Sequence, residues 1–140
     1  MNKTLITFFT VLFCLTSSVS WSFEYKDLVE RDGIYYKKFT DVPFTGKIDG
    51  QFNGLIENGK REGSWVVFHQ NGHLYFKGDY KNGKEDSSWV SYWDNGQLNY
   101  KGNYNNGKRE GSYELYYRNG QLNKKMKWKY GFGVKKWSPP

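Results

Sequence analysis

The chain has 140 residues, the length of one ordinary domain, and its 21 lysine and arginine residues against 14 acidic residues give a formal net charge of +7. Aromatic residues make up 20% of the sequence, which excludes an acidic disordered tail, because such a tail has too little apolar surface to bury. The single cysteine excludes a disulfide framework and a zinc site built from cysteines.

Residues 1–20 are predicted to form a secretory signal peptide. Lys3 gives a positive start, an apolar stretch follows, and small polar residues end the segment, an order typical of exported proteins. We expect cleavage before Trp21 or two residues later, and a periplasmic or secreted mature chain. Lipidation at Cys14 is disfavoured because the bulky Phe13 precedes it. A short buried strand or helix of the domain is the alternative interpretation of this segment.

Residues 21–57 are expected to form one sequence-divergent hairpin that caps the start of the sheet. The stretch DGIYYKKFTDVPFTGKI alternates between apolar and polar residues and carries a turn signal at Val42 and Pro43. Phe52 and Gly54 occupy columns that recur in the later part of the chain. Terminal units of a repeat array are often atypical, because they cap its end.

The rest of the chain repeats with a period of 24 residues. Asn-Gly recurs at 58–59, 82–83 and 106–107, and again at 71–72, 95–96 and 119–120. Residues 58–130 therefore divide into three units, at 58–81, 82–105 and 106–129, and residues 131–140 are expected to form an irregular tail. The repeated structural columns include Trp65, Trp89, Tyr113, Leu74, Leu98, Leu122, Gly78 and Gly102.

Asn-Gly between alternating segments predicts a two-residue hairpin turn, because both central residues need a positive φ. A turn of this kind at 71–72 places Trp65 opposite Gly78 and Phe68 opposite Tyr75. The equivalent turn at 95–96 places Trp89 opposite Gly102, where the glycine leaves room for the indole. The Asn-Gly turn at 82–83 is expected to place Trp89 opposite Phe76, which keeps the same aromatic residues on the same face. The sequence thus predicts an elongated antiparallel β-meander of about nine strands.

The two faces of this sheet are expected to differ. The tryptophans and the leucines of the repeat are assigned to the buried face. The other face is the candidate binding face, and it consists of Phe68, Tyr75, Lys77, Tyr92, Lys101, Tyr116 and Lys125. Glu114 is predicted to lie opposite Lys125, as an opposite-charge pair across two strands. Aromatic rings beside basic side chains suit nucleobases, sugars or an acidic protein, and export argues against nucleic acid.

The motif NGKREGSW…NGQL…KGNY resembles the MORN repeat, in the variant form common in bacteria. Together with the opening stretch, it resembles exported members of the YwqK-like antitoxin family of toxin–antitoxin systems. The resemblance covers about residues 32–128. It implies a row of β-hairpins in one elongated sheet, and a toxin as the protein partner.

No catalytic, cofactor or metal site is predicted. The only histidines are His69 and His73, and the predicted hairpin places them on opposite faces, so they cannot share a metal ion. Glu62 and Glu110 recur with the repeat beside turns, which is typical of solvated loops rather than of a carboxylate pair with catalytic geometry. We therefore expect a protein that is not an enzyme.

Two functions stay open at this level. The first is a protein-binding module of the antitoxin or immunity type, which acts by occupying its partner. The second is a structural or phospholipid-surface-binding protein of the bacterial envelope, because a net charge of +7 favours anionic partners. A homo-oligomer is compatible with either function.

Overall fold

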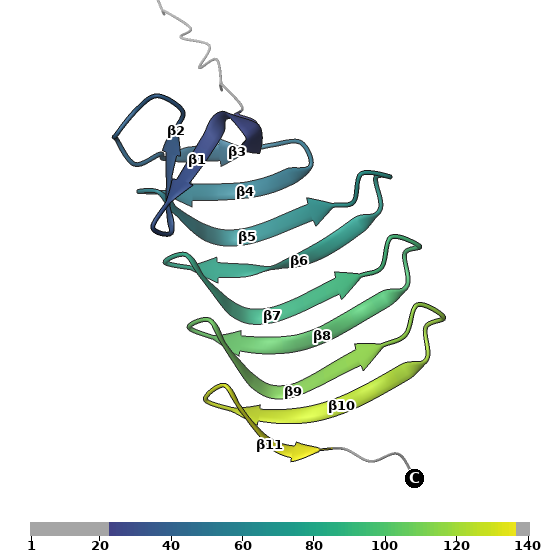
Figure 1. Ribbon diagram of the computed structural model, residues 1–140. Coiled ribbons are helices and arrows are strands. Elements are labelled where there is room, and N and C mark those ends of the chain that lie inside the picture. The colour runs from purple at the N-terminus through teal and green to yellow at the C-terminus, as the bar shows by residue number, and fades with distance from the viewer. Residues whose placement is uncertain (1–22, 137–140) are drawn as a thin grey trace, which may run out of the picture.

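The computed structural model describes residues 23–136, so the predicted signal peptide at 1–20 lies outside the described residues. Nine strands form one antiparallel sheet in which strand order follows chain order from β3 to β11 (Figure 1). Strands β1 and β2 form a separate hairpin. The prediction of an all-β antiparallel meander is confirmed.

The elements are short and regular. The bounds are a 3-10 turn at Tyr25–Asp27, β1 Leu28–Arg31, β2 Ile34–Lys37, β3 Gly46–Ile48, β4 Phe52–Glu57, β5 Lys60–Phe68, β6 Leu74–Lys81, β7 Lys84–Tyr92, β8 Leu98–Asn105, β9 Lys108–Tyr116, β10 Leu122–Lys129 and β11 Phe132–Lys136. Within residues 23–136, no helix has the length and hydropathy that crossing a bilayer requires.

The Asn-Gly turns at 58–59, 82–83 and 106–107 are two-residue hairpin turns, as predicted. Asn82 and Gly83 have φ values of 51° and 81°, the combination that this turn requires. Tyr130 and Gly131 take the same conformation, with φ values of 53° and 84°, and lead into β11. The prediction of an irregular tail is therefore wrong for residues 132–136. It failed because a tyrosine stands at the turn position that asparagine occupies in the earlier repeats.

The Asn-Gly turns at 71–72, 95–96 and 119–120 are longer than predicted. In the first of them only Gly72 has a positive φ, of 84°. The amide of Gly72 donates to the carbonyl oxygen of His69 at 2.9 Å, and the amide of His69 donates to the carbonyl oxygen of His73 at 2.7 Å. The loop therefore has three residues, a type I turn followed by a left-handed glycine.

A bulge at the start of β6 compensates for the longer loop. Phe68 pairs with Leu74, not with Tyr75 as predicted, and Tyr75 has no partner across the hairpin. The extra loop residue and the extra strand residue offset each other, so Trp65 still pairs with Gly78. Within the β5–β6 hairpin the predicted register of the strand bodies is confirmed, although the predicted turn is wrong.

A second irregularity follows each Asn-Gly turn of the first series. Ser87 has a φ of 58°, and the two equivalent residues, Gly63 and Gly111, have φ values of 64° and 70°. The register between β6 and β7 shifts at this point, so Trp89 pairs with Gly78. The prediction that Trp89 lies opposite Phe76 is therefore wrong.

Trp65 and Trp89 consequently each lie between two glycines, whereas Tyr113 lies between Gly102 and Met126. In all three cases the ring covers the earlier glycine. A Cβ atom on Gly78 would overlap the indole of Trp89. The indole is held there because its Nε1 donates to the carbonyl oxygen of Asp79 at 3.1 Å. Gly102, which we expected to lie under Trp89, is instead covered by the ring of Tyr113. The resulting pairs are Trp65 on Gly54, Trp89 on Gly78 and Tyr113 on Gly102.

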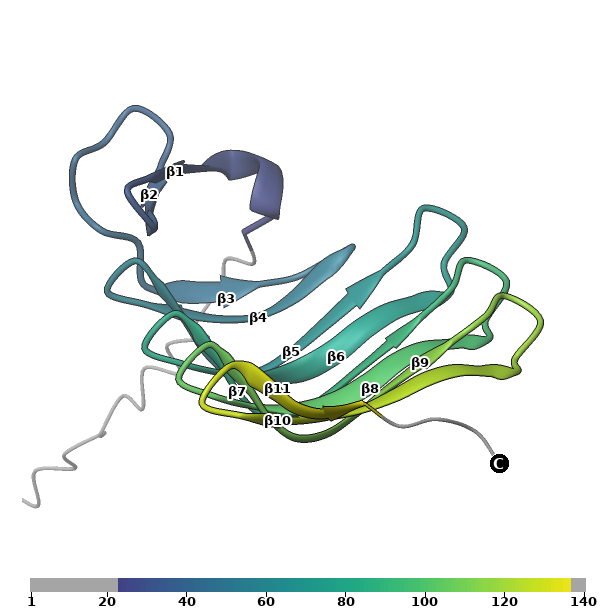
Figure 2. The ribbon, with the colours of Figure 1, turned by 60° about the horizontal axis from the view of Figure 1, so that its bottom comes forward.

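The sheet is curved, and the β1–β2 hairpin lies over its concave side (Figure 2). We call the side that carries Trp65, Trp89 and Tyr113 the concave face, and the opposite side the outer face. These three rings are 0%, 4% and 3% exposed, and Trp65 and Trp89 share a buried cluster with Leu28 and Tyr35 of the hairpin.

Residues 21–57 were expected to contain one hairpin, but the described part of this range contains two. Strands β1 and β2 are joined at Asp32 and Gly33, whose φ values are 51° and 77°. Strands β3 and β4 form the second hairpin. Val42 and Pro43 lie in the segment between the two hairpins, not in a hairpin turn. Asp-Gly is as good a turn signal as Asn-Gly, and it is the signal that the sequence reasoning missed.

Candidate functional site

The concave face carries a row of ordered aromatic rings. Phe76 stacks on Trp89 with ring centroids 5.2 Å apart, and Tyr100 stacks on Tyr113 at 5.4 Å. Trp89 and Tyr113 are buried, whereas Phe76 and Tyr100 are half-buried. Burial raises the pKa of the Tyr100 hydroxyl to about 12, so this side chain is neutral at physiological pH. The face therefore offers flat, uncharged rings on a rigid support.

Arg61 fixes the N-terminal hairpin on this face. Its Nη2 donates to the hydroxyls of Tyr25 and Tyr35 at 2.6 and 2.8 Å, and its Nη1 donates to the hydroxyl of Tyr80 at 2.7 Å. The guanidinium also lies over the ring of Trp65, 5.1 Å from its centroid. Burial opposes its charge, but the surrounding tyrosines outweigh burial, and the pKa of Arg61 rises above its ordinary value. Sequence reasoning missed this residue, although Lys-Arg-Glu-Gly recurs at 60–63 and 108–111.

The recurring glutamates have structural partners. Glu62 Oε2 accepts a hydrogen bond from the amide of Asn82 at 2.7 Å, and Glu110 Oε2 accepts one from the amide of Tyr130 at 2.8 Å. Each carboxylate thus holds the next hairpin turn, which explains why it recurs with the repeat.

The two histidines also connect neighbouring repeats. His69 Nε2 lies 3.0 Å from the carbonyl oxygen of Tyr92, and His73 Nδ1 lies 2.7 Å from that of Asp94. Within the part of the chain that the structure describes, no group of three or more histidine, cysteine or acidic side chains could hold a metal ion.

The outer face carries six of the seven predicted binding residues, by strand parity: Phe68, Lys77, Tyr92, Lys101, Tyr116 and Lys125. Tyr75 does not belong to this set. Its ring lies 5.4 Å from that of Phe76 and 4.7 Å from that of His69, because the bulge turns it to the concave side.

The same bulges move the repeated leucines in the opposite direction. Leu74, Leu98 and Leu122 pair with Phe68, Tyr92 and Tyr116 on the outer face, not with the tryptophan column as predicted. The outer face therefore carries a row of leucine side chains beside the three-residue loops.

Two of the predicted binding lysines are engaged within the sheet. Glu114 Oε2 lies 2.9 Å from Lys101 Nζ, and Glu114 Oε1 lies 2.8 Å from Lys125 Nζ, so the predicted opposite-charge pair is confirmed. The hydroxyl of Tyr116 donates to the same carboxylate at 2.6 Å. The hydrogen bonds from Lys125, Tyr116 and Lys101 lower the pKa of Glu114 to about 2. These side chains satisfy one another, which makes this part of the outer face a weak anchor for a partner.

Replacing Glu114 with glutamine is expected to destabilise the protein by about 1–2 kcal/mol at pH 7. The carboxylate is ionised in the folded chain down to pH about 2, whereas in the unfolded chain it binds a proton near pH 4.5. Its contribution is therefore complete above pH 5 and is lost as the pH falls towards 2. Urea melts of both proteins at several pH values measure the difference, and a difference that does not change with pH contradicts the assignment.

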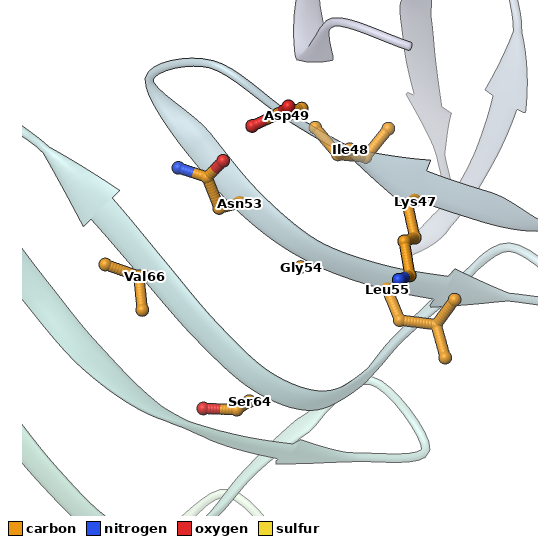
Figure 3. A pocket seen from close by; sticks show the side chains of 8 residues that line it. All are labelled: Lys47, Ile48, Asp49, Asn53, Gly54, Leu55, Ser64 and Val66. Carbon is orange, nitrogen blue, oxygen red and sulfur yellow. The ribbon is translucent and has the colours of Figure 1, made fainter. Parts of the chain in front are cut away.

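A groove of about 480 Å³ lies on the outer face between β3, β4 and β5 (Figure 3). Gly54 lies in its middle, and Lys47, Asp49, Leu55 and Ser64 are among the side chains around it. No histidine or cysteine lines the groove. We assign it no chemistry.

Comparison with protein families identifies the repeat. Residues 61–82, 85–106 and 109–130 each match the model of the MORN repeat variant. Each matched range begins three residues after the start of a unit predicted at 58, 82 or 106. No curated protein matches the chain.

Proposed function

We propose that this chain, which contains three consecutive MORN repeats, is a non-enzymatic protein-binding module whose concave face holds the partner. The observation that carries the proposal is the aromatic row on that face. The β1–β2 hairpin covers its first part, and the part on β8 to β10 has no cover among the described residues (Figures 1 and 2). Aromatic and arginine side chains are the residue types that anchor protein interfaces.

The rigidity of the row supports this proposal. Trp89 packs against Gly78 and Tyr113 packs against Gly102. Phe76 stacks on Trp89, and Tyr100 stacks on Tyr113. Rings that are already ordered lose little conformational entropy when a partner covers them, so more of the contact energy appears as affinity. Curvature adds selectivity, because a concave surface fits a convex partner.

The finer proposal is an exported protein of the antitoxin or immunity type. The signal-like start at residues 1–20 supports export, and the resemblance of the repeats to YwqK-like antitoxins supports a toxin as the partner. Such a protein acts by occupying its partner, so it needs no catalytic residue or cofactor.

A second candidate function rests on the lysines of β10. Lys125, Lys127 and Lys129 follow one another along the outer face of β10, a strand that contains no acidic residue. Such a cluster favours anionic phospholipid head groups, as expected for a protein of the envelope surface.

Affinity capture from the envelope fraction of the host, compared with sedimentation on phosphatidylglycerol vesicles, separates the two functions. We expect one protein to be retained in stoichiometric amount at 0.5 M salt. Vesicle binding through lysines should be largely lost at that ionic strength, because exposed charges are then screened. Vesicle binding without any retained protein would contradict the protein-binding proposal and favour the envelope surface.

A further inference from the structure

Four positions of the concave face recur two repeats apart, 48 residues further along the chain. Phe52, Arg61, Trp65 and Tyr80 form the first set, and Tyr100, Arg109, Tyr113 and Trp128 form the second. Both sets combine one arginine with three aromatic rings. The repeat between them has Glu85 at the arginine position, so this combination occurs at the two ends of the row and not in its middle.

The first set shows what this arrangement binds. The ring of Tyr25 stacks on Phe52 with centroids 4.4 Å apart and an interplanar angle of 19°. The hydroxyls of Tyr25 and Tyr35 accept hydrogen bonds from Arg61. The N-terminal segment thus places the ring of Tyr25 against Phe52, and the hydroxyl oxygens of Tyr25 and Tyr35 against the guanidinium of Arg61.

The second set repeats the contacts between the arginine and the rings, with Tyr104 beside Arg109 on the neighbouring strand. The guanidinium of Arg109 lies 4.4 Å from the ring centroid of Tyr113 and 5.0 Å from that of Trp128. Tyr100 stacks on Tyr113. The β1–β2 hairpin lies over β3 and β4 at the far end of the sheet, and no other described segment lies over β8 to β10 (Figures 1 and 2). None of the five ion pairs found among residues 23–136 involves Arg109.

The charge around the second set is positive. Arg109 and Lys124 contribute this charge, and the strand that carries Lys124, β10, contains no acidic residue. Lys124 shares the concave face with Tyr100, because both pair with Leu115, from the strands on either side of it. These two basic side chains favour an occupant that carries negative charge.

We propose that Tyr100, Arg109, Tyr113 and Trp128 form a docking site for an acidic segment of the partner protein. The segment places an aromatic ring over Tyr100 and a carboxylate on Arg109. The planar guanidinium can bind both oxygens of a carboxylate, which distinguishes it from the point charge of a lysine. A flat bilayer does not fit a concave surface, so the occupant is a protein segment. This inference rests on the proposed function and adds the site and the chemistry of the partner.

Titration of the full mature chain with two fluorescein-labelled polymers tests the site. The probes are a random copolymer of glutamate and tyrosine and a polyglutamate of the same length and label. Fluorescence anisotropy at low salt should show tighter binding of the copolymer, by about tenfold, because aromatic stacking adds to the charge interaction. The copolymer reproduces both features of the proposed segment, whereas polyglutamate reproduces only its charge.

Two variants with equal loss of charge assign the binding to one face. Arg109→Gln should weaken copolymer binding about tenfold, since it removes hydrogen bonds to a charged group. Lys127→Gln changes an outer-face residue of β10, paired with Ser112, and should change binding less than twofold. Arg109→Lys keeps the charge and should recover only part of the loss. Circular dichroism melts verify that the variants are folded.

Equal binding of the two polymers, or equal loss in the two glutamine variants, overturns the inference, because binding is then diffuse attraction to lysines. Absence of copolymer binding overturns it as well. The proposed function is judged separately. A protein captured from the envelope fraction that the copolymer cannot displace refutes this site and leaves the protein-binding function standing.

Discussion

Replacing Gly78 with valine is expected to destabilise the protein by about 3 kcal/mol, at the upper end of the usual range for overpacked cores. Even the first carbon of the new side chain would overlap the indole of Trp89. The ring cannot move aside without loss, because its Nε1 donates to the carbonyl oxygen of Asp79 and Phe76 stacks on it. Equilibrium unfolding in urea gives the value.

Asp79→Val is the matched control for this prediction. Asp79 follows Gly78 in β6, and its side chain lies on the outer face, where a β-branched residue suits a strand. We expect its effect to stay within about 0.5 kcal/mol. Equal effects at the two neighbouring positions would show that the assignment of faces is wrong.

A double-mutant cycle identifies the ring that covers the glycine. Gly78 pairs with Trp65 on one side and with Trp89 on the other. Gly78→Ala combined with Trp89→Leu should show a coupling energy above about 1 kcal/mol, and combined with Trp65→Leu a coupling below about 0.5 kcal/mol. A larger coupling energy with Trp65→Leu than with Trp89→Leu would place the indole of Trp65 on Gly78.

Arg61→Gln is expected to destabilise the protein by about 2–3 kcal/mol, because hydrogen bonds to a charged group are lost and buried tyrosine hydroxyls lose their donor. The loss should be concentrated in the N-terminal hairpin, since Tyr25 and Tyr35 both bond to Arg61. Native-state hydrogen exchange should show that residues 28–37 lose protection, while β8 and β9 keep theirs.

Arg118→Gln is the control for this second prediction. Arg118 pairs with Asp94 on the exposed loops, and such surface pairs contribute about 0–1 kcal/mol. A hairpin that keeps its protection in Arg61→Gln would show that apolar packing alone holds it on the concave face.

The body of the sheet could be predicted from the sequence because its rules are local. Asn82 and Gly83 both need a positive φ, and alternation then fixes the parity of every strand. The same dipeptide at 71–72 also fits a three-residue loop, in which only the glycine needs a positive φ. The sequence does not distinguish the two turns, so the compensating bulge at Tyr75 and the face of Leu74 were missed.

The candidate site was harder to predict because it depends on distant contacts. Arg61 meets Tyr25 across 36 positions of the chain, and no local pattern places a hairpin over the concave face. Lys-Arg-Glu-Gly was interpreted as a solvated turn, although Arg61 and Arg109 both lie against aromatic rings. The expected binding role of the outer face stays a prediction, and the geometry favours the concave face.

Site-specific photo-crosslinking tests whether the concave face holds the partner. A photoreactive phenylalanine derivative replaces Tyr100 on the concave face in one protein and Tyr92 on the outer face in another, and each is irradiated in host cells. Both residues are half-buried tyrosines on adjacent strands, so they form a matched pair. We predict that position 100 crosslinks to one protein and that position 92 does not. Crosslinking from position 92 alone, or equally from both positions, would contradict the assignment of the binding face.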